Sequence, residues 1–301
     1  MLDIQRILCP IDFSDASRRA LAHAVTIGQW YGSHITALHV GNPMIVLTAN
    51  PPVLFAEASD GVLAGKTSRL ELEDHLGEWL APAKSAGLQT DVVVDEGDPA
   101  ARILERARSL PANLIVMGTH GRGGFERFVL GSAAEKVLRK ATCPVMTVPP
   151  PSAVTSKLPF AHLLCPVDFS DSSIAALRFA FSLAQESNAR LTLLHVFEWP
   201  SDEASARRVL ETSEFHRQWE VETRQRLDAL IPDEVRNWCT PEPKLAFGKA
   251  YQQILSVAMN EHVDLIVTGV QGRNALDLML FGSTTNQVVM QAGCPVLTLR
   301  S

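Results

Sequence analysis

The sequence contains two copies of one domain-sized pattern, and this duplication is the strongest constraint on its fold. Residues 7–17 (ILCPIDFSDAS) return as residues 163–173 (LLCPVDFSDSS), with eight of eleven positions identical. Residues 114–132 (LIVMGTHGRGGFERFVLGS) return as residues 265–283 (LIVTGVQGRNALDLMLFGS). The copies are offset by 151 to 156 residues, whereas solenoid repeats recur every ~20–50 residues. The sequence therefore predicts a duplicated domain and not a repeat array.

The boundary between the copies lies in residues 148–159 (VPPPSAVTSKLP), where consecutive prolines favour an extended linker. We expect the first domain at residues 1–150 and the second at residues 157–301. The chain has 301 residues in all, which is a length that suits two domains of ordinary size.

Each copy alternates strand-like and helix-like segments. In the first copy, short apolar runs predict five strands, at residues 7–12, 34–40, 92–94, 114–117 and 145–148. Periodic apolar positions predict helices after the N-cap residue Ser14, across residues 72–83, from Pro99 onward and over residues 133–141. This alternation predicts an α/β fold, with a parallel sheet covered by helices on both faces. Ligands of such sheets bind beyond the carboxyl ends of the strands.

Composition and charge narrow the classes of function. Apolar residues make up 46% and charged residues 20% of the chain, as in ordinary globular proteins. The net charge of −6 argues against a general nucleic-acid binder, which needs a basic face. We see neither a signal-peptide pattern nor the ~20-residue apolar run of a membrane helix, so we expect no membrane partner. The five cysteines form no CxxC pair, which predicts reduced thiols and a cytoplasmic location.

A glycine-rich segment between a strand and a helix is the first candidate site in each copy. Glycine lets the backbone approach a ligand closely, and a helix N-terminus favours negative charge, so this segment predicts a phosphate site. Arg122 and Arg273 add a guanidinium that can reach phosphate oxygens. A loop that holds no ligand is the alternative interpretation. The segment matches neither a Walker A motif nor a dinucleotide fingerprint.

Two aspartates are the second repeated polar feature. Asp12 and Asp168 each follow an apolar strand and precede Phe-Ser. Such a carboxylate can accept a hydrogen bond from a ligand, or it can cap the next helix together with the following serine. Both interpretations stay open at this point. His39 and His195 also repeat, at the end of the second strand, and we favour a packing role for them.

At these residues the chain resembles the universal stress protein family in its tandem two-domain form. Nucleotide-binding members of that family carry Gly, two residues, Gly, nine residues, Gly, and then Ser or Thr. Both copies match this spacing, and the resemblance covers nearly the whole chain. It implies two tandem five-stranded parallel-sheet sandwiches, adenine nucleotide α-hydrolase-like, with strand order 3-2-1-4-5. It also implies that the domains pair through their fifth strands, residues 145–148 and 296–299, and leaves a further homodimer open.

The resemblance implies one ATP site in each domain. The aspartate after strand one lies against the adenosine, the end of strand two against adenine, and the glycine loop with its serine holds ribose and phosphates. The implied residues of the first domain are Ile11, Asp12, Val40, Met117, Gly118, Gly121, Arg122, Gly131, Ser132 and Ala133. Those of the second domain are Val167, Asp168, Val196, Thr268, Gly269, Gly272, Arg273, Gly282, Ser283 and Thr284. We expect no metal site made by protein side chains, and magnesium would accompany ATP through its phosphates.

The leading hypothesis is an ATP-binding regulatory or stress-response protein that is not an enzyme, since the sequence shows little catalytic machinery. Slow ATP hydrolysis or nucleotidyl transfer is one alternative. A scaffold with a vestigial site is another, with the apolar segment at residues 41–56 as a lid, a partner surface or a loop packed on its own domain. The first copy carries more cations in and after its loop, so we predict tighter binding there. These cations are Arg122, Arg127, Lys136, Arg139 and Lys140.

Overall fold

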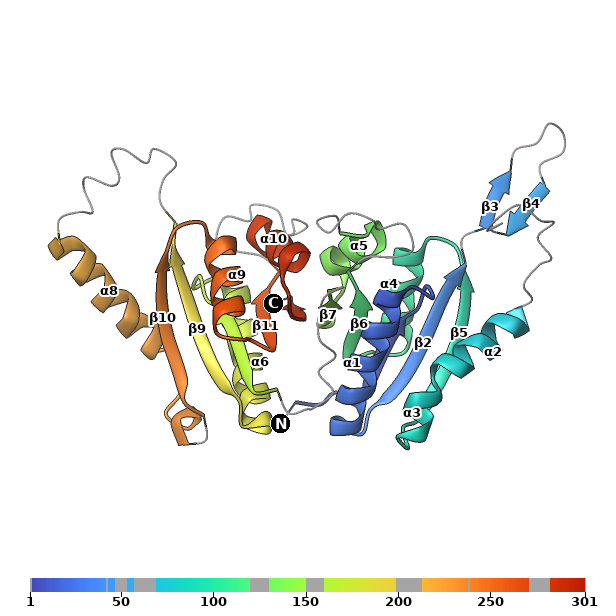
Figure 1. Cartoon of the computed structure of the whole chain (residues 1–301), viewed down its shortest axis with the longest axis horizontal. Helices are drawn as coiled ribbons and strands as arrows, with labels where there is room; N and C mark the ends of the chain where they lie inside the picture. The colour runs from blue at the N-terminus through green and yellow to red at the C-terminus, as the bar shows by residue number, and fades with distance from the viewer. Residues whose placement is uncertain are drawn as a thin grey trace. The chain divides into compact units, whose positions relative to one another are not determined.

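The chain forms two compact units in the computed structural model, which Figure 1 shows. The first unit spans residues 3–150, and the second spans residues 151–301 together with the first two residues. The structure describes residues 2–41, 43–46, 53–56, 69–119, 130–149, 160–198, 213–237, 239–270 and 282–300. Each unit is an α/β domain of its own.

The first unit contains a five-stranded parallel sheet. Its strands are β1 (Arg6–Pro10), β2 (His34–Gly41), β5 (Thr90–Glu96), β6 (Leu114–Gly118) and β7 (Val145–Val148). They pair in the order β5-β2-β1-β6-β7, which is 3-2-1-4-5 within the unit. The helices are α1 (Asp15–Tyr31), α2 (Arg69–Trp79), α3 (Ala81–Ser85), α4 (Pro99–Ser109) and α5 (Ser132–Lys140). The predicted fold class and strand order are confirmed.

The second unit repeats this architecture. Its strands are β8 (His162–Pro166), β9 (Arg190–Phe197), β10 (Pro241–Phe247), β11 (Leu265–Gly269) and β12 (Val296–Leu299), in the parallel order β10-β9-β8-β11-β12. The helices are α6 (Asp171–Ser187), α8 (Ser213–Asp228), α9 (Ala250–Asn260) and α10 (Ser283–Gln291), with a 3-10 turn, η1 (Val235–Asn237). The register is also repeated, because Cys9 pairs with Ala37 and Cys165 pairs with Leu193 at the equivalent position.

The central strand of each sheet is buried on both faces, which is why its sequence is continuously apolar and does not alternate. Ile7, Leu8 and Cys9 of β1 are at most 1% exposed. Helix α1 follows directly, and it begins at the predicted N-cap, where the Ser14 side chain accepts a hydrogen bond from the Ser17 N–H. It ends at Gly32 in the left-handed conformation, as helices commonly do.

One predicted helix is wrong. The apolar positions across residues 72–83 predict one helix, but the structure has α2 ending at Trp79 and α3 beginning at Ala81. Pro82 lies in the first turn of α3. A proline there has no N–H to donate, and its ring clashes with the carbonyl four residues earlier in a continuous helix. The chain therefore starts a new helix after Leu80.

The segment after β2 in the first unit contains a small antiparallel hairpin. It consists of β3 (Pro43–Val46) and β4 (Val53–Ala56), which pair with each other and form a sheet separate from the main one. All eight of its residues are apolar or proline. The hairpin occupies part of the segment at residues 41–56 that the sequence offered as a lid or partner surface.

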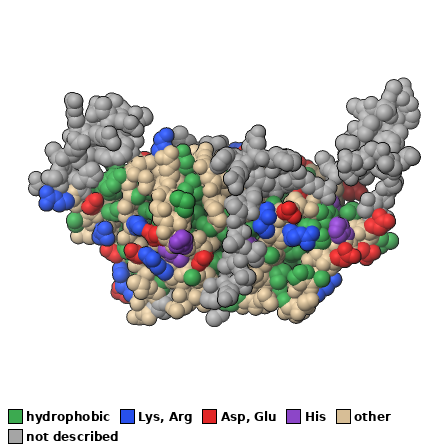
Figure 2. Space-filling view, in the orientation of Figure 1, with side chains coloured by type: hydrophobic (Ala, Val, Ile, Leu, Met, Phe, Trp, Pro, Cys, Tyr) green, Lys and Arg blue, Asp and Glu red, His purple; other side chains and the backbone are tan. Residues whose placement is uncertain are grey.

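The surface described by the structure offers no broad basic patch on the face that Figure 2 shows. Lys and Arg side chains lie there among Asp and Glu side chains. Within the described residues, no helix has the length and apolar character needed to cross a membrane.

Candidate functional site

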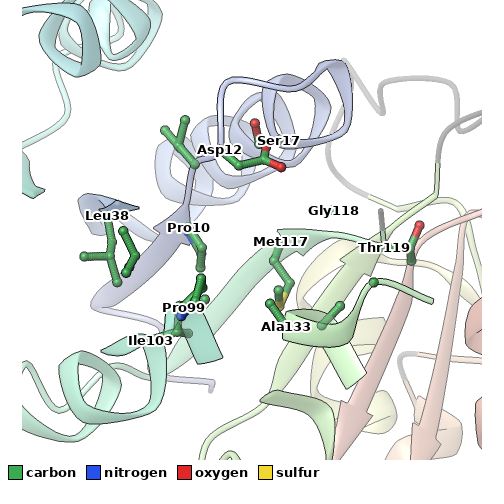
Figure 3. A pocket seen from close by; sticks show the side chains of 14 residues that line it. Pro10, Asp12, Ser17, Leu38, Pro99, Ile103, Met117, Gly118, Thr119 and Ala133 are labelled. Atoms are coloured by element: carbon green, nitrogen blue, oxygen red, sulfur yellow. The ribbon is translucent and has the colours of Figure 1, made fainter. Parts of the chain in front are cut away.

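A cleft lies in the first unit at the carboxyl ends of β1, β2 and β6, where the N-termini of α4 and α5 meet them (Figure 3). Seven of the ten site residues predicted for this domain line it, namely Ile11, Asp12, Val40, Met117, Gly118, Gly131 and Ala133. Ser132 is exposed at the first position of α5 and is not part of the wall. Gly121 and Arg122 lie outside the described residues.

The cleft also contains residues that the sequence reasoning missed. Pro99 and Ile103 come from the buried face of α4, and Leu38 comes from β2. Pro10, Ser17, Thr119 and Ala134 complete the wall. The sequence repeat could have identified Ser17 as a site residue, because Ser17 belongs to the repeated DFSDxS stretch and returns as Ser173. The α4 residues had no such signal, because only the sheet topology brings the helix after the third strand to this edge.

The aspartate at the end of the first strand supports the turn into the next helix. Asp12 Oδ1 accepts hydrogen bonds from the Ser14 N–H (3.0 Å) and from Ser14 Oγ (2.6 Å). Asp168 makes the same contacts with Ser170, at 3.0 and 2.5 Å. In Figure 3, Asp12 and Ser17 lie on one side of the cleft. Ser14 is the residue that caps α1, and Asp12 supports it by accepting these two hydrogen bonds while its carboxylate lies on the cleft wall.

The residue after each aspartate has an unusual backbone. Phe13 and Phe169 have φ angles of 62° and 64°, in the left-handed region that bulky side chains avoid. Such a conformation costs about 1–3 kcal/mol and persists only where surrounding contacts impose it. The same strained residue therefore sits beside the candidate site in both units.

The first glycine of each loop has a packing role that the sequence did not predict. A Cβ added to Gly118 would lie 2.8 Å from Ala16 Cβ and 3.0 Å from the Ala16 carbonyl carbon. A Cβ added to Gly269 would lie 2.7 Å from the Ser172 carbonyl carbon. These glycines let the start of the first helix pack against the end of the fourth strand. Close approach is thus required here by the protein itself, whatever ligand the cleft holds.

The last glycine of each loop closes the loop and starts the next helix. The Gly131 N–H donates to the Thr119 carbonyl at 2.9 Å, and the Gly282 N–H donates to the Val270 carbonyl at the same distance. No side chain caps α5 or α10 at these residues. The first-turn N–H groups of an uncapped helix attract anions. In the first unit this helix end lies on the cleft wall, through Gly131, Ala133 and Ala134.

Two of the cations that distinguish the first copy are already paired. Lys136 Nζ lies 3.0 Å from Asp98 Oδ2, and Arg139 Nη1 lies 3.2 Å from Glu135 Oε1. The Ala101 N–H bonded to the Asp98 carboxylate, with a smaller contribution from Lys136, lowers the pKa of that carboxyl. Arg122 and Arg127 lie outside the described residues, so the predicted ranking of the two sites stays a prediction.

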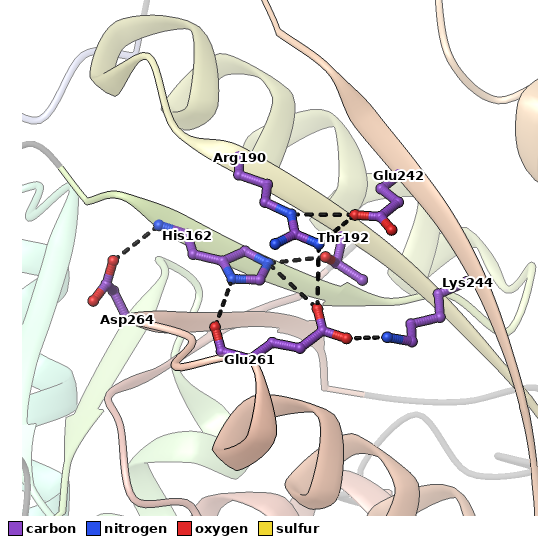
Figure 4. Close-up of polar contacts among 7 residues, drawn as sticks. All are labelled: His162, Arg190, Thr192, Glu242, Lys244, Glu261 and Asp264. Atoms are coloured by element: carbon purple, nitrogen blue, oxygen red, sulfur yellow. Dashed lines mark hydrogen bonds and ion pairs between the residues drawn. The ribbon is translucent and has the colours of Figure 1, made fainter.

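The opposite, amino-terminal edge of the second sheet carries a polar network (Figure 4). His162 Nε2 lies 2.9 Å from Thr192 Oγ1, and its Nδ1 lies 3.1 Å from the Glu261 carbonyl. The Glu261 carboxylate pairs with Lys244, and Arg190 pairs with Glu242. The first unit has different contacts there, with Arg6 donating to the Leu110 carbonyl. This edge lies at the opposite end of the strands from the residues predicted for the nucleotide site of the second unit, such as Asp168 and Thr268.

The described residues provide no metal centre and no activated thiol. Among them, no group of three or more His, Cys, Asp or Glu side chains could hold a metal ion. Burial raises the pKa of the Cys9 thiol to about 12 and that of Cys143 to about 11. A thiol with such a pKa is a poor nucleophile at neutral pH.

The fold and the repeated loops define a tandem α/β protein, and comparison with known sequences names its family. The model of the Universal stress protein family matches residues 3–149 and 159–300. The chain therefore belongs to the universal stress protein family and contains two of its domains. The resemblance inferred from the sequence is confirmed.

Related proteins span both one and two domains of this chain. Universal stress protein MJ0531 of Methanocaldococcus jannaschii is 33% identical over 147 residues, covering 49% of this chain and 83% of its own length. Universal stress protein Rv2623 of Mycobacterium tuberculosis is 26% identical over 309 residues, covering 98% of this chain and 96% of its own. The crystal structure of a universal stress protein from Archaeoglobus fulgidus has a TM-score of 0.67 at 22% identity and covers 99% of both chains.

Proposed function

We propose that each unit binds ATP at the carboxyl edge of its sheet and that the chain acts as an ATP-binding regulatory protein of the stress response. One observation carries this proposal. The cleft of the first unit brings the carboxylate of Asp12, the end of β2 at Val40 and the uncapped N-terminus of α5 to one place. These elements suit the hydroxyl or amine of a nucleoside, an apolar base and a phosphate chain, respectively.

The size of the cleft indicates how a nucleotide would lie in it. The cleft has a volume of about 130 Å³, close to the ~150 Å³ of a cavity that holds one benzene ring. A volume of this size fits a ring-sized fragment such as a base against the apolar side chains of Val40 and Ile103. The phosphates would lie beyond it, along the first turn of α5. Magnesium, when present, would be coordinated mainly by the phosphates.

A binding role agrees better with the described wall than catalysis does. Asp12 is the single titratable side chain among the described residues that line the cleft. One of its oxygens already accepts two hydrogen bonds from Ser14. General acid–base catalysis needs a positioned group that can exchange a proton with the substrate. We therefore propose a regulatory protein and not an efficient ATPase.

The first experiment is to purify the protein without added nucleotide, denature it, and identify and count the released molecules by mass spectrometry. The expected result is close to two ATP per chain. One ATP per chain would support unequal sites, and ADP would favour slow hydrolysis. If nothing is released and calorimetry detects no ATP binding, the proposal is wrong and the scaffold alternative gains support.

Two charge variants assign the bound nucleotide to a site. Ser132→Glu and Ser283→Glu place a carboxylate at the first position of α5 or α10, where both serines are exposed. An acidic residue in the first turn favours the helix but repels phosphate, so each variant should fold and lose ATP at its own site. Ser132→Gln and Ser283→Gln are the uncharged controls, which lose the same hydroxyl and should retain more ATP than the glutamate variants. The larger loss from Ser132→Glu would also support the predicted ranking of the sites.

A further inference from the structure

The strained phenylalanine after Asp12 contacts two rings of another helix. Phe13 stacks on His75 of α2, with ring centroids 4.5 Å apart and planes 5° apart. It also meets the edge of Trp79 at 5.4 Å, and the Arg18 guanidinium lies 4.1 Å above the Trp79 ring. These contacts explain how a bulky residue remains in the left-handed conformation, because helix α2 fixes its ring from outside.

A histidine contacts both residues that flank Asp12. His39 Nδ1 lies 2.7 Å from the Ile11 carbonyl, and its ring centroid lies 4.8 Å from that of Phe13. The carbonyl can only accept, so Nδ1 carries the proton in this hydrogen bond. The His39 side chain therefore contacts the backbone of Ile11, which precedes Asp12, and the ring of Phe13, which follows it. We call Phe13, His39, His75 and Trp79 the aromatic clamp of the first unit.

The second unit keeps this arrangement with partly different side chains. His195 Nδ1 lies 2.7 Å from the Val167 carbonyl, and its ring lies 4.9 Å from Phe169. The partner from the following helix is now Arg226 of α8, whose guanidinium lies 4.2 Å above the Phe169 ring. Trp219 of α8 lies 6.0 Å from His195. The contact between this helix and the phenylalanine persists although its chemistry changes, which indicates a geometric requirement.

We propose that Phe13 and His39, and likewise Phe169 and His195, are positioning residues that couple the helix after the second strand to the aspartate of the nucleotide site. This proposal rests on the proposed function and names a route for its regulation. A nucleotide that fixes Asp12 stabilises the packing of α2 through the clamp. Because coupling is reciprocal, a change that loosens or fixes α2 alters nucleotide affinity by the same factor by which the nucleotide alters the packing equilibrium of α2.

The aromatic clamp links a firmly held turn, which contains Asp12, to a helix with few buried residues, α2. Asp12 lies in a turn fixed by hydrogen bonds to Ser14 and by the buried end of β1. Helix α2 instead exposes most of its surface, and only Leu76 and Trp79 of it are buried. An element with few buried residues opens locally at low free energy. Coupling through Phe13 would therefore appear as a change in the opening of α2.

Hydrogen exchange with the full-length protein tests the coupling. Saturating ATP should slow amide exchange in α2 and α8 of the wild type. Phe13→Gly removes the ring but keeps a residue that adopts the left-handed backbone without strain. In this variant ATP should no longer slow exchange in α2, the affinity of the first site should fall roughly tenfold, and α8 should respond as in the wild type. Phe169→Gly is the matched control and should reverse the pattern.

Two variants of His39 separate the hydrogen bond from simple packing, because both remove the imidazole ring and only one keeps the donor. His39→Asn keeps a donor that can reach the Ile11 carbonyl, whereas His39→Leu does not. The asparagine variant should retain more of the ATP response of α2 than the leucine variant. ATP that binds the wild type without slowing exchange in α2, or that still slows it in Phe13→Gly, would overturn the coupling and leave the proposed function standing. A wild type that binds no ATP would overturn both.

Discussion

The replacement of Gly118 by alanine tests the close packing of α1 against β6. The added methyl group would meet Ala16 Cβ at 2.8 Å, whereas ordinary van der Waals contacts begin near 3.4 Å. The neighbouring atoms belong to backbone as well as side chain, so the start of α1 has to move away by several tenths of an ångström. Overpacking of this kind costs about 1–3 kcal/mol. The first unit should therefore unfold at a midpoint lower by roughly 2–12 °C.

Differential scanning calorimetry measures this loss, and hydrogen exchange assigns it to the first unit. The matched control is Gly77→Ala in α2, where the nearest atom to the added Cβ is Lys84 Nζ at 3.8 Å. That variant should be neutral or stabilising, because alanine is favoured over glycine in a helix. If Gly118→Ala is as stable as the wild type, or if the control loses as much stability, the packing argument is wrong. Gly269→Ala should repeat the loss in the second unit.

Three further predictions follow from the polar and buried groups. Lys136→Met should change ATP affinity at the first site by less than about twofold in calorimetry, because Asp98 already binds this ammonium; a tenfold loss would instead place Lys136 on the phosphates. Hydrogen bonds from Arg106 lower the pKa of Asp95 in the folded protein. The Asp95 carboxylate therefore stabilises the folded state fully at a pH above its unfolded pKa of about 3.9, and this stabilisation is lost as the pH falls through the folded pKa. Asp95→Asn should then lower stability at pH 7 but converge with the wild type in acid denaturation near pH 2, and a difference that is independent of pH would refute this. Burial raises the pKa of Cys143 to about 11 and that of Cys294 to about 12, so iodoacetamide should label both slowly at pH 8 in the folded protein and quickly in urea; fast labelling of the folded protein would contradict the burial.

The five strands of the first main sheet were predictable because each contains a short apolar run, as Ile7 to Pro10 shows, whereas the hairpin strands β3 and β4 were not predicted. The order of the strands depended on the family resemblance, since periodicity gives the faces of an element and not its neighbours. The break at Pro82 was visible in the sequence, but the apolar spacing on both sides of it favoured one continuous helix. The strained backbone of Phe13 had no sequence signal, because the residue type argues against it.

The wall of the cleft was predictable where one residue is repeated in both copies, as Asp12 is by Asp168. It was less predictable where partners come from distant segments. Nothing in the spacing indicates that Lys136 pairs with Asp98, 38 residues away. Gly118 was identified for the right property, the absence of a side chain, but the group that approaches it is helix α1. Sequence patterns report which atoms are missing at a position more readily than which atoms come close.

The polar network at the amino-terminal edge of the second sheet has a consequence for how a duplicated chain assembles. Strand β1 pairs with β2 in the same register in which β8 pairs with β9. The pairing alone therefore does not prevent a nascent chain from inserting either strand into either sheet. Misassembly between similar domains is a characteristic failure of such proteins. His162 is buried beside Glu261, whereas Arg6 is exposed. A guanidinium in place of the imidazole would be forced into a buried position next to Arg190 and Lys244. The burial of this position thus favours β8 over β1 as the central strand of the second sheet.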